Sequence, residues 1–433
     1  MKKILSFITS TMILLSLSSC KNNIPEEPYI ATNAGTSVFN QIMETEDGYY
    51  YNATLFGNLS LRYYDKATGS SLFLCAKPEC THDGNSFCTA TGGGFDGMYT
   101  AMYGDYIYIS AIDSGEERSE FKLLRASVDG TELTEVCSFM NYNTKEEGGR
   151  LFGDDQRSMV IHRGYAFVPY FIVTNREDGA GVAGTAVINV ENGKYKLLTE
   201  YDSSVTRGPE SVTADGDYFY YLINNYGNMT ETEIWRYNFI TNKEEKLTLR
   251  ESLYDYIGAT FNTTGIRNYM PIDGKIWYIW HDYHNTRAEM FIYNPEDDTT
   301  IKPEQFADKL CTLTEEYDDN GELLSINYKA FVQPVIRYDG NYLYIAEKGF
   351  YGFYGTDYYD YYLYPFKLHI FTLEGEELGS FIYEYEDACQ MNIVNKTVYI
   401  QTTGGVEYCA VSDIIDGNTE WKKLYSFEQN EVE

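Results

Sequence analysis

Basic residues are scarce in this chain of 433 residues, which holds 33 lysines and arginines against 65 aspartates and glutamates, a formal net charge of −32. A surface so rich in carboxylates repels phosphate backbones, so the composition argues against nucleic-acid binding. It also repels anionic lipid head groups, so attachment to a bilayer would need something other than a basic face. We attribute the acidic excess to solubility rather than calcium binding, because segment 318–322 lacks the alternating oxygen ligands of an EF-hand.

Signature motifs of catalysis are also missing. The sequence has no Gly-x-Ser-x-Gly elbow, no phosphate-binding loop and no His-Glu-x-x-His metal site. His281 and His284, beside Asp282, could bind a metal or exchange protons. Their spacing of three would place them on opposite faces of a straight strand, which argues against that role. The sequence therefore assigns no catalytic residue.

Long apolar runs are lacking except at the N-terminus. Lys2 and Lys3 precede an apolar run of 14 residues, Ile4–Leu17, and small residues then lead into Cys20. A cationic start, a short apolar core and small residues are typical of a secretory signal, here residues 1–19. The run is too short for an ordinary transmembrane helix, and no later stretch approaches the roughly 20 apolar residues that such a helix needs.

The segment Leu17-Ser18-Ser19-Cys20 resembles the lipobox of bacterial lipoproteins. The resemblance implies that Cys20 is acylated, becomes the first residue after cleavage, and anchors the protein in the lipid bilayer at the extracytoplasmic face of the cell membrane. More than one acyl chain is needed, because each buried CH₂ contributes only about 0.8 kcal/mol. Residues 20–36, with two prolines, are expected to form a tether. The alternative is a soluble secreted protein in which Cys20 is incidental.

The remainder of the chain, residues 37–433, is organised by an internal repeat. Each copy is a polar turn, usually containing glycine, followed by alternating aromatic residues, as in Asp47-Gly48-Tyr49-Tyr50-Tyr51. The last aromatic falls at 51, 108, 167, 220, 278, 344 and 399, in steps of 53 to 66 residues. This period lies somewhat above the about 40 to 50 residues of four-stranded propeller blades. We therefore predict an all-β, seven-bladed β-propeller of four-stranded antiparallel blades.

The lengths of the connections predict where a ligand would bind. Within each blade, strands A to D run outward from the axis, so A–B and C–D turns share one rim while B–C and D–A links share the other. The expected long D–A links are 75–95, 138–157, 251–265 and 303–333, and the B–C links of blades three and six are also long. All of these expansions are expected on the B–C/D–A rim, which predicts binding there.

The densest aromatic feature, residues 350–362, is expected in the B–C link of blade six. Tyrosine rings beside carboxylates can stack on sugars, hydrogen-bond to them, or grip a peptide. The predicted ligand-binding residues are Tyr351, Tyr354, Tyr358, Tyr359 and Tyr361, with Trp280 and His281 at the end of strand B of blade five. The alternative is a long hairpin whose rings pack over the channel.

Four soft ligands lie close together in the first D–A link. Cys75, Cys80, His82 and Cys88 fall within 14 residues and could close a tetrahedral zinc site. The four residues between the first two cysteines make a looser spacing than the usual zinc knuckle. In an exported protein two of the three thiols could instead form a disulfide, or the segment could be a plain loop. A zinc site or a disulfide would have a structural role, stapling this link.

The segment from Leu74 to His82 resembles one that recurs in uncharacterised β-propeller lipoproteins of anaerobic gut bacteria. The blade pattern extends that resemblance over most of the chain, but only this short motif is specific. The resemblance implies a lipid-anchored propeller and no known activity.

The sequence thus predicts a membrane-anchored extracytoplasmic binding or scaffold lipoprotein that recognises a glycan or a peptide on the B–C/D–A rim. One alternative is an extracytoplasmic carbohydrate-active enzyme, a lyase or hydrolase, that uses rim carboxylates or the two histidines of blade five. Another is a structural component of a surface complex.

Overall fold

The computed structural model describes much of the chain between Met43 and Ser426. The described ranges are 43–52, 61–82, 88–94, 96–114, 118–143, 159–173, 181–198, 200–202, 206–225, 232–248, 264–282, 287–306, 309–317, 323–330, 334–347, 366–383, 388–394, 396–402 and 405–426. Within these ranges no helix is long and apolar enough to cross a membrane. The signal sequence, Cys20 and the tether lie outside them and stay predictions.

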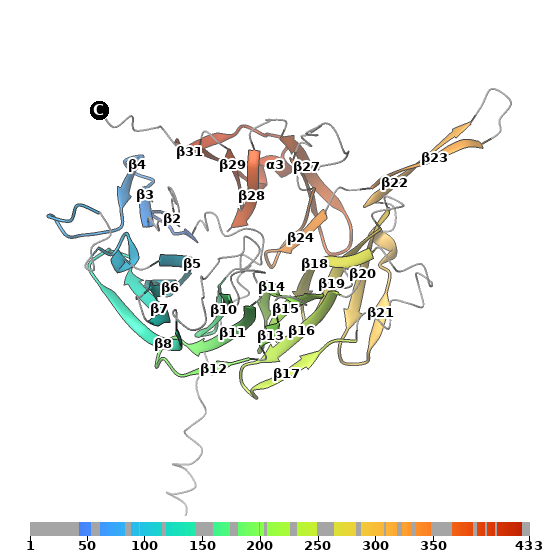
Figure 1. The fold of residues 1–433 in the computed structure, drawn as a ribbon. Coiled ribbons are helices and arrows are strands. Elements are labelled where there is room, and N and C mark those ends of the chain that lie inside the picture. The colour runs from blue at the N-terminus through green and yellow to red at the C-terminus, as the bar shows by residue number, and fades with distance from the viewer. Residues whose placement is uncertain are drawn as a thin grey trace, which may run out of the picture.

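Seven antiparallel sheets form a closed ring (Figure 1), so the predicted seven-bladed propeller is confirmed. The strands of each sheet follow one another in the chain, with strand A nearest the centre and strand D at the outer edge. Among the described strands, only the third sheet has a fifth member, β13, which pairs with β11.

The first four blades have these bounds. Blade one holds β1 (Met43–Glu44), β2 (Gly48–Asn52), β3 (Leu61–Asp65) and β4 (Ser70–Phe73); blade two holds β5 (Asp96–Tyr103), β6 (Tyr106–Ser114), β7 (Arg118–Ser127) and β8 (Leu133–Asn143). Blade three holds β9 (Val160–His162), β10 (Tyr165–Val173), β11 (Gly181–Asn189), β12 (Tyr195–Leu197) and β13 (Tyr201–Asp202); blade four holds β14 (Thr206–Asp215), β15 (Tyr218–Asn225), β16 (Thr232–Asn238) and β17 (Lys243–Lys246).

The other three blades complete the ring. Blade five holds β18 (Thr264–Ile272), β19 (Lys275–Asp282), β20 (Arg287–Asn294) and β21 (Thr299–Ile301); blade six holds β24 (Pro334–Tyr338), β25 (Leu343–Glu347), β26 (Phe366–Phe371) and β27 (Glu377–Tyr383). Blade seven holds β28 (Ala388–Val394), β29 (Thr397–Thr402), β30 (Gly405–Ala410) and β31 (Lys422–Ser426).

The core consists of side chains packed between neighbouring blades. The seven aromatics that define the repeat all lie on strand B and are at most 3% exposed. Because side chains alternate along a strand, each strand B serves two junctions. Tyr50 packs toward blade two, whereas Tyr49 and Tyr51 pack toward blade seven. The described residues form seven such clusters, one at each junction of the ring.

Tight A–B turns explain why the repeat was visible in the sequence. Two residues separate strands A and B in blades two to five. In blade three Arg163 and Gly164 have φ angles of 47° and 79°, and in blade five Asp273 and Gly274 have 51° and 75°. Positive φ at both central residues is typical of a type I′ turn, whose twist matches that of the flanking strands.

The A–B/C–D rim carries one long connection that the sequence did not predict, in blade seven. In blade seven β30 ends at Ala410, and a short helix, α3 (Val411–Ile415), fills part of the C–D link. The link spans residues 411–421, so the prediction that every long connection lies on the B–C/D–A rim is wrong for this blade. The helix packs Val411 and Ile414 into the junction of blades six and seven.

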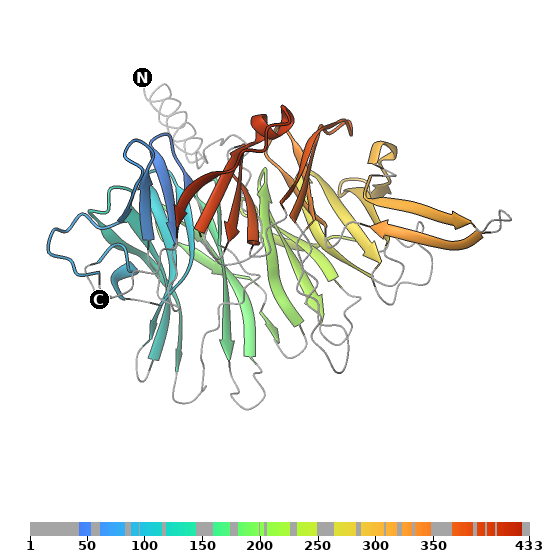
Figure 2. The same ribbon diagram turned by 90° about the horizontal axis from the view of Figure 1, so that it is seen from above.

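Two D–A links also extend from the B–C/D–A rim to contact C–D turns of the neighbouring blades. The link after blade one reaches the C–D turn of blade two, where the amide of Ala76 donates to the carbonyl of Gly130 at 3.0 Å. The link after blade five includes η2 (Glu304–Phe306), and Gln305 Nε2 donates to the carbonyl of Leu373 beside the C–D turn of blade six at 3.4 Å. That same link holds the hairpin of β22 (Cys311–Tyr317) and β23 (Leu323–Ala330), which projects away from the ring (Figures 1 and 2).

Candidate functional site

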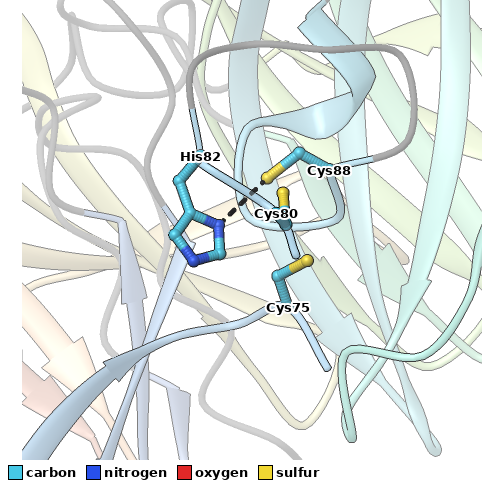
Figure 3. A group of neighbouring side chains, drawn as sticks. All are labelled: Cys75, Cys80, His82 and Cys88. Atoms are coloured by element: carbon cyan, nitrogen blue, oxygen red, sulfur yellow. Dashed lines mark hydrogen bonds between the residues drawn. The ribbon is translucent and has the colours of Figure 1, made fainter. Parts of the chain in front are cut away.

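Three thiols and one imidazole meet in the D–A link of blade one (Figure 3). The ligand atoms of Cys75, Cys80, His82 and Cys88 all lie within 4.8 Å of one another. Nδ1 of His82 lies 3.4 Å from Sγ of Cys88. Around a tetrahedral zinc ion the sulfur atoms would lie about 3.8 Å apart and the sulfur and nitrogen atoms about 3.6 Å apart. The donors are therefore placed so that small movements would bring them onto one metal ion.

The cluster is only partly open to solvent. Cys88 is fully buried, while Cys75, Cys80 and His82 are half-buried. Burial raises the pKa of the Cys88 thiol, so without a metal this group holds its proton. No disulfide joins the three cysteines of the cluster in this structure.

His82 is held by an aromatic neighbour. Its backbone adopts a left-handed conformation with a φ of 55°, which is uncommon outside glycine. Its ring stacks on Phe73 with centroids 4.4 Å apart and planes 23° apart. The guanidinium of Arg62 lies 4.1 Å from the Phe73 centroid. A strained backbone persists only where its surroundings fix it, and this stack supplies part of that constraint.

Gly130 holds the cluster against blade two. Its carbonyl accepts hydrogen bonds from the amide of Ala76 at 3.0 Å and from the hydroxyl of Thr89 at 3.1 Å. These donors neighbour Cys75 and Cys88 in the chain, so both ends of the cluster dock on one turn. A metal bound here would staple blade one to blade two.

A groove of about 1020 Å³ lies on the A–B/C–D rim over blades two, three and four. Its walls come from the A–B turns of blades two and three, residues 103–106 and 163–165, and from the C–D turns of blades three and four, residues 189–196 and 237–242. Turns far apart in the chain thus form one surface.

The groove is basic although the chain is strongly acidic. Its charged lining residues are Arg125, Arg163, Lys194, Lys196, Asp105 and Glu191. Four positive and two negative side chains give +2, against −32 for the whole chain.

Rings and carbonyls hold these cations in place. The guanidinium of Arg125 lies 4.8 Å from the ring centroid of Tyr106. Nζ of Lys196 donates to the carbonyl of Asn242 at 2.9 Å and lies 5.2 Å from the ring centroid of Tyr237. Among the described residues neither cation has a salt-bridge partner, so their charge stays available to a ligand. Cation–π contacts of this kind position a cation without neutralising it.

Arg163 and Lys194 differ in how they are paired. Arg163 forms a salt bridge with Asp217 and also donates to the carbonyl of Gly216 at 3.2 Å. Lys194 is exposed, and no acidic group in the described ranges pairs with it. Within the described part of the chain, three cations of the groove therefore have no acidic partner.

The groove also exposes apolar surface. Tyr195 is 48% exposed and Ile240 is 41% exposed. Tyr165 and Phe239 lie deeper, with ring centroids 4.9 Å apart. The ring of Tyr195 packs edge to face near Phe139 of blade two, while Lys196 on the next position contacts blade four. A groove that exposes this ring together with lysines is suited to a ligand with both a flat face and polar groups.

No family model matches this chain, and no curated protein matches it. Solved structures similar to it include a prolyl endopeptidase, with 11% identity and a TM-score of 0.46 over 92% of this chain and 50% of that one. The chain thus spans about half the length of that protein. An oligogalacturonate lyase from Vibrio parahaemolyticus has 8% identity and a TM-score of 0.45, covering 87% and 89% of the two chains. TolB from Acinetobacter baumannii has 12% identity and a TM-score of 0.33, covering 86% and 76%. Likenesses this distant indicate no activity.

The structure places few of the residues predicted for ligand binding. Trp280 lies in β19, is 3% exposed, and packs in the hydrophobic cluster between blades four and five. The backbone of His281 pairs with Gly265 and Ala288 in the same sheet, but its side chain lies outside the described part of the chain. The tyrosines of 350–362 and His284 also lie outside it, so their predicted roles stay predictions.

Sequence reasoning missed the groove. The usable signal was Lys194-Tyr195-Lys196, two cations around an aromatic residue in an otherwise acidic chain. The other residues of the groove, such as Arg125 and Asn242, lie about 50 to 70 residues away in the chain and belong to no recognisable sequence motif.

Proposed function

We propose that this propeller is a binding protein that holds a glycan in the groove over blades two to four. The supporting observation is that the exposed ring of Tyr195 lines the same groove as Lys194, Lys196 and the side chains of Asn189 and Asn242. Sugar recognition needs ring faces for stacking and fixed polar groups for the hydroxyls.

The character of the groove favours binding over catalysis. Its two acidic side chains, Asp105 and Glu191, are both exposed and come from different blades. A carboxyl that acts as a general acid near neutral pH needs an environment that shields it from water. Neither side chain has that environment, so a lyase or hydrolase role finds little support in the groove.

A glycan array probed with residues 37–433 tests this proposal. Tyr195→Ala should weaken glycan binding about tenfold, because loss of stacking and buried area removes about 1.4 kcal/mol. Leu72→Ala is the matched control, since Leu72 is 59% exposed on blade one, away from the groove. The proposal would be refuted if the unaltered protein bound no glycan, or if the Tyr195 variant bound glycans equally well. Binding only to peptides would show that the ligand is a peptide and not a glycan.

We also propose that Cys20 carries the lipid anchor and that the propeller acts outside the cytoplasm. The support is the sequence Leu17-Ser18-Ser19-Cys20 behind a short apolar core. In a bacterial host that processes lipoproteins, the wild type should fractionate with membranes and Cys20→Ser should be soluble. Mass spectrometry should find acyl chains on the mature N-terminal Cys20. An N-terminal peptide with the mass of the unmodified sequence would refute the proposal.

We further propose that zinc occupies the cluster of Cys75, Cys80, His82 and Cys88 in a structural role. Three thiolates and an imidazole are a donor set that suits zinc, and four protein ligands leave no open position for a substrate. Metal analysis should find about one zinc per chain, lost in Cys88→Ser and kept in Cys137→Ser, a cysteine outside the cluster. A stoichiometry near zero in the wild type would exclude zinc.

A further inference from the structure

We infer that the groove selects acidic glycans, in which uronate sugars present carboxylates to its cations. This inference rests on the proposed glycan-binding function and names its ligand class. Its basis is the reversal of charge between the groove and the chain, which carries −32: the lining residues sum to +2, or to +1 when Asp217, the partner of Arg163, is counted.

Screening decides which charges a ligand in the groove experiences. At physiological ionic strength the Debye length is about 8 Å, so exposed carboxylates elsewhere on the propeller are largely screened. The cations that line the groove act at contact distance. Asp217 is already paired with Arg163, and Asp105 and Glu191 are the two acidic residues that line the groove. The local field should therefore attract an anion even though the whole chain would repel one.

The cations are distributed along the groove. Arg125 belongs to blade two, Lys194 and Lys196 belong to blade three, and Lys196 is held by the carbonyl of Asn242 in blade four. An extended polymer that crosses the turns would meet these cations in succession, which suits a chain of repeating acidic units.

Two of the cations have an aromatic neighbour, and the groove also exposes one ring. Arg125 lies over Tyr106 and Lys196 lies over Tyr237, which is buried, while Tyr195 is 48% exposed. A uronate unit has a flat ring face with a carboxylate at its edge, so it can stack on Tyr195 while its carboxylate pairs with a cation of the groove. The carboxylate of an acidic peptide stands on a flexible stem and gains nothing from an adjacent ring. The arrangement therefore favours a uronate over an acidic peptide.

Calorimetric titration with matched charged and neutral glycans tests the inference. The probes are oligosaccharides of alginate, hyaluronan and polygalacturonate, each compared with its carboxyl methyl ester. At least one acid form should bind about tenfold more tightly than its ester, since only the acid forms charge-assisted hydrogen bonds. That preference should shrink in about 0.5 M salt, because the cations are exposed.

Charge variants localise the effect. Lys194→Gln with Lys196→Gln should abolish the preference for the acid over the ester. The control variant Lys422→Gln with Lys423→Gln removes the same amount of charge from exposed positions on β31 of blade seven. This control should retain the preference for the acid over the ester. Tyr195→Ala should weaken both the acid and the ester, because stacking does not depend on the carboxylate.

The outcomes separate this inference from the function on which it rests. Equal affinity for acids and esters would overturn the acidic preference and leave glycan binding in place. No binding of any glycan would overturn both. Binding only to a poly-glutamate peptide or to anionic vesicles, included as further probes, would also overturn the acidic-glycan inference.

Discussion

Tyr49 of blade one meets Tyr399 of blade seven edge to face, with ring centroids 5.8 Å apart and planes at 80°. The Tyr399 hydroxyl also donates to Oε2 of Glu44 at 3.2 Å. These contacts join the first and last blades, and within the described ranges no strand of either blade pairs with a strand of the other. Among these residues, side-chain packing holds the two blades together.

Removing the Tyr399 ring should weaken this closure. Tyr399→Ala deletes a side chain that is 1% exposed, so we expect the free energy of unfolding to fall by about 3 to 5 kcal/mol. Tyr399→Phe keeps the ring and loses only the hydrogen bond, and should cost about 1 kcal/mol. Urea unfolding followed by tyrosine fluorescence measures both. Equal stability of the two variants would show that the ring does not carry the closure.

The fold was predictable because each blade repeats one local rule. A turn such as Asp273-Gly274 fixes where a hairpin begins, and an aromatic such as Tyr278 follows at a fixed offset on strand B. Burial on both faces of the blade demands that pattern at every copy. Seven copies along the chain therefore predicted seven blades without any knowledge of the contacts between them.

The candidate sites were predictable only in part. The metal-ligand cluster could be proposed because its four donors lie within 14 residues of one another. Its supports, Phe73 and Gly130, are ordinary residues of a strand and a turn, and only the packing of blade one on blade two reveals their roles. The groove was missed because it forms where turns of three blades converge, an arrangement that depends on the closed ring.

Gly130 should be critical for the junction of blades one and two. An added Cβ would lie 2.9 Å from the backbone nitrogen of Cys75, and the φ of 71° strains any other residue. We expect Gly130→Ala to destabilise the protein by about 2 to 3 kcal/mol and to reduce its zinc content.

Gly104 supplies the matched control for that substitution. Its φ of 58° is also left-handed, but an added Cβ would meet nothing within 4 Å. Gly104→Ala should therefore cost only the conformational strain, about 1 kcal/mol, and leave the zinc content unchanged. Thermal unfolding and metal analysis of both variants test the difference, and equal effects would argue against the contact with Cys75.

Buried tyrosines should make the protein sensitive to alkali. Burial raises the pKa of Tyr237 to about 12 and, as the largest of several effects, that of Tyr49 to about 12, from a usual value of 10.0. The folded protein then keeps protons that the unfolded chain releases, so this stability is complete below about pH 10 and is lost as the pH rises toward about 12. Each group contributes up to about 3 kcal/mol.

Urea unfolding between about pH 8 and pH 11 measures this loss. Exposed tyrosines such as Tyr195 ionise in the folded protein, but the tyrosinate absorbance of the buried rings should appear together with unfolding. Tyr237→Phe should make the decline shallower, while Tyr195→Phe, at a ring that is 48% exposed, should not change it. Stability that stays constant up to about pH 11 would contradict the assigned burial effect.

Hydrogen exchange with and without a bound glycan tests most directly where this protein binds its ligand. We expect a ligand identified on the array to slow exchange in residues 189–196 and 237–242, the C–D turns that border the groove. Protection confined to residues 348–365 and the other B–C and D–A links, with these turns unchanged, would place the ligand on the opposite rim and contradict the groove.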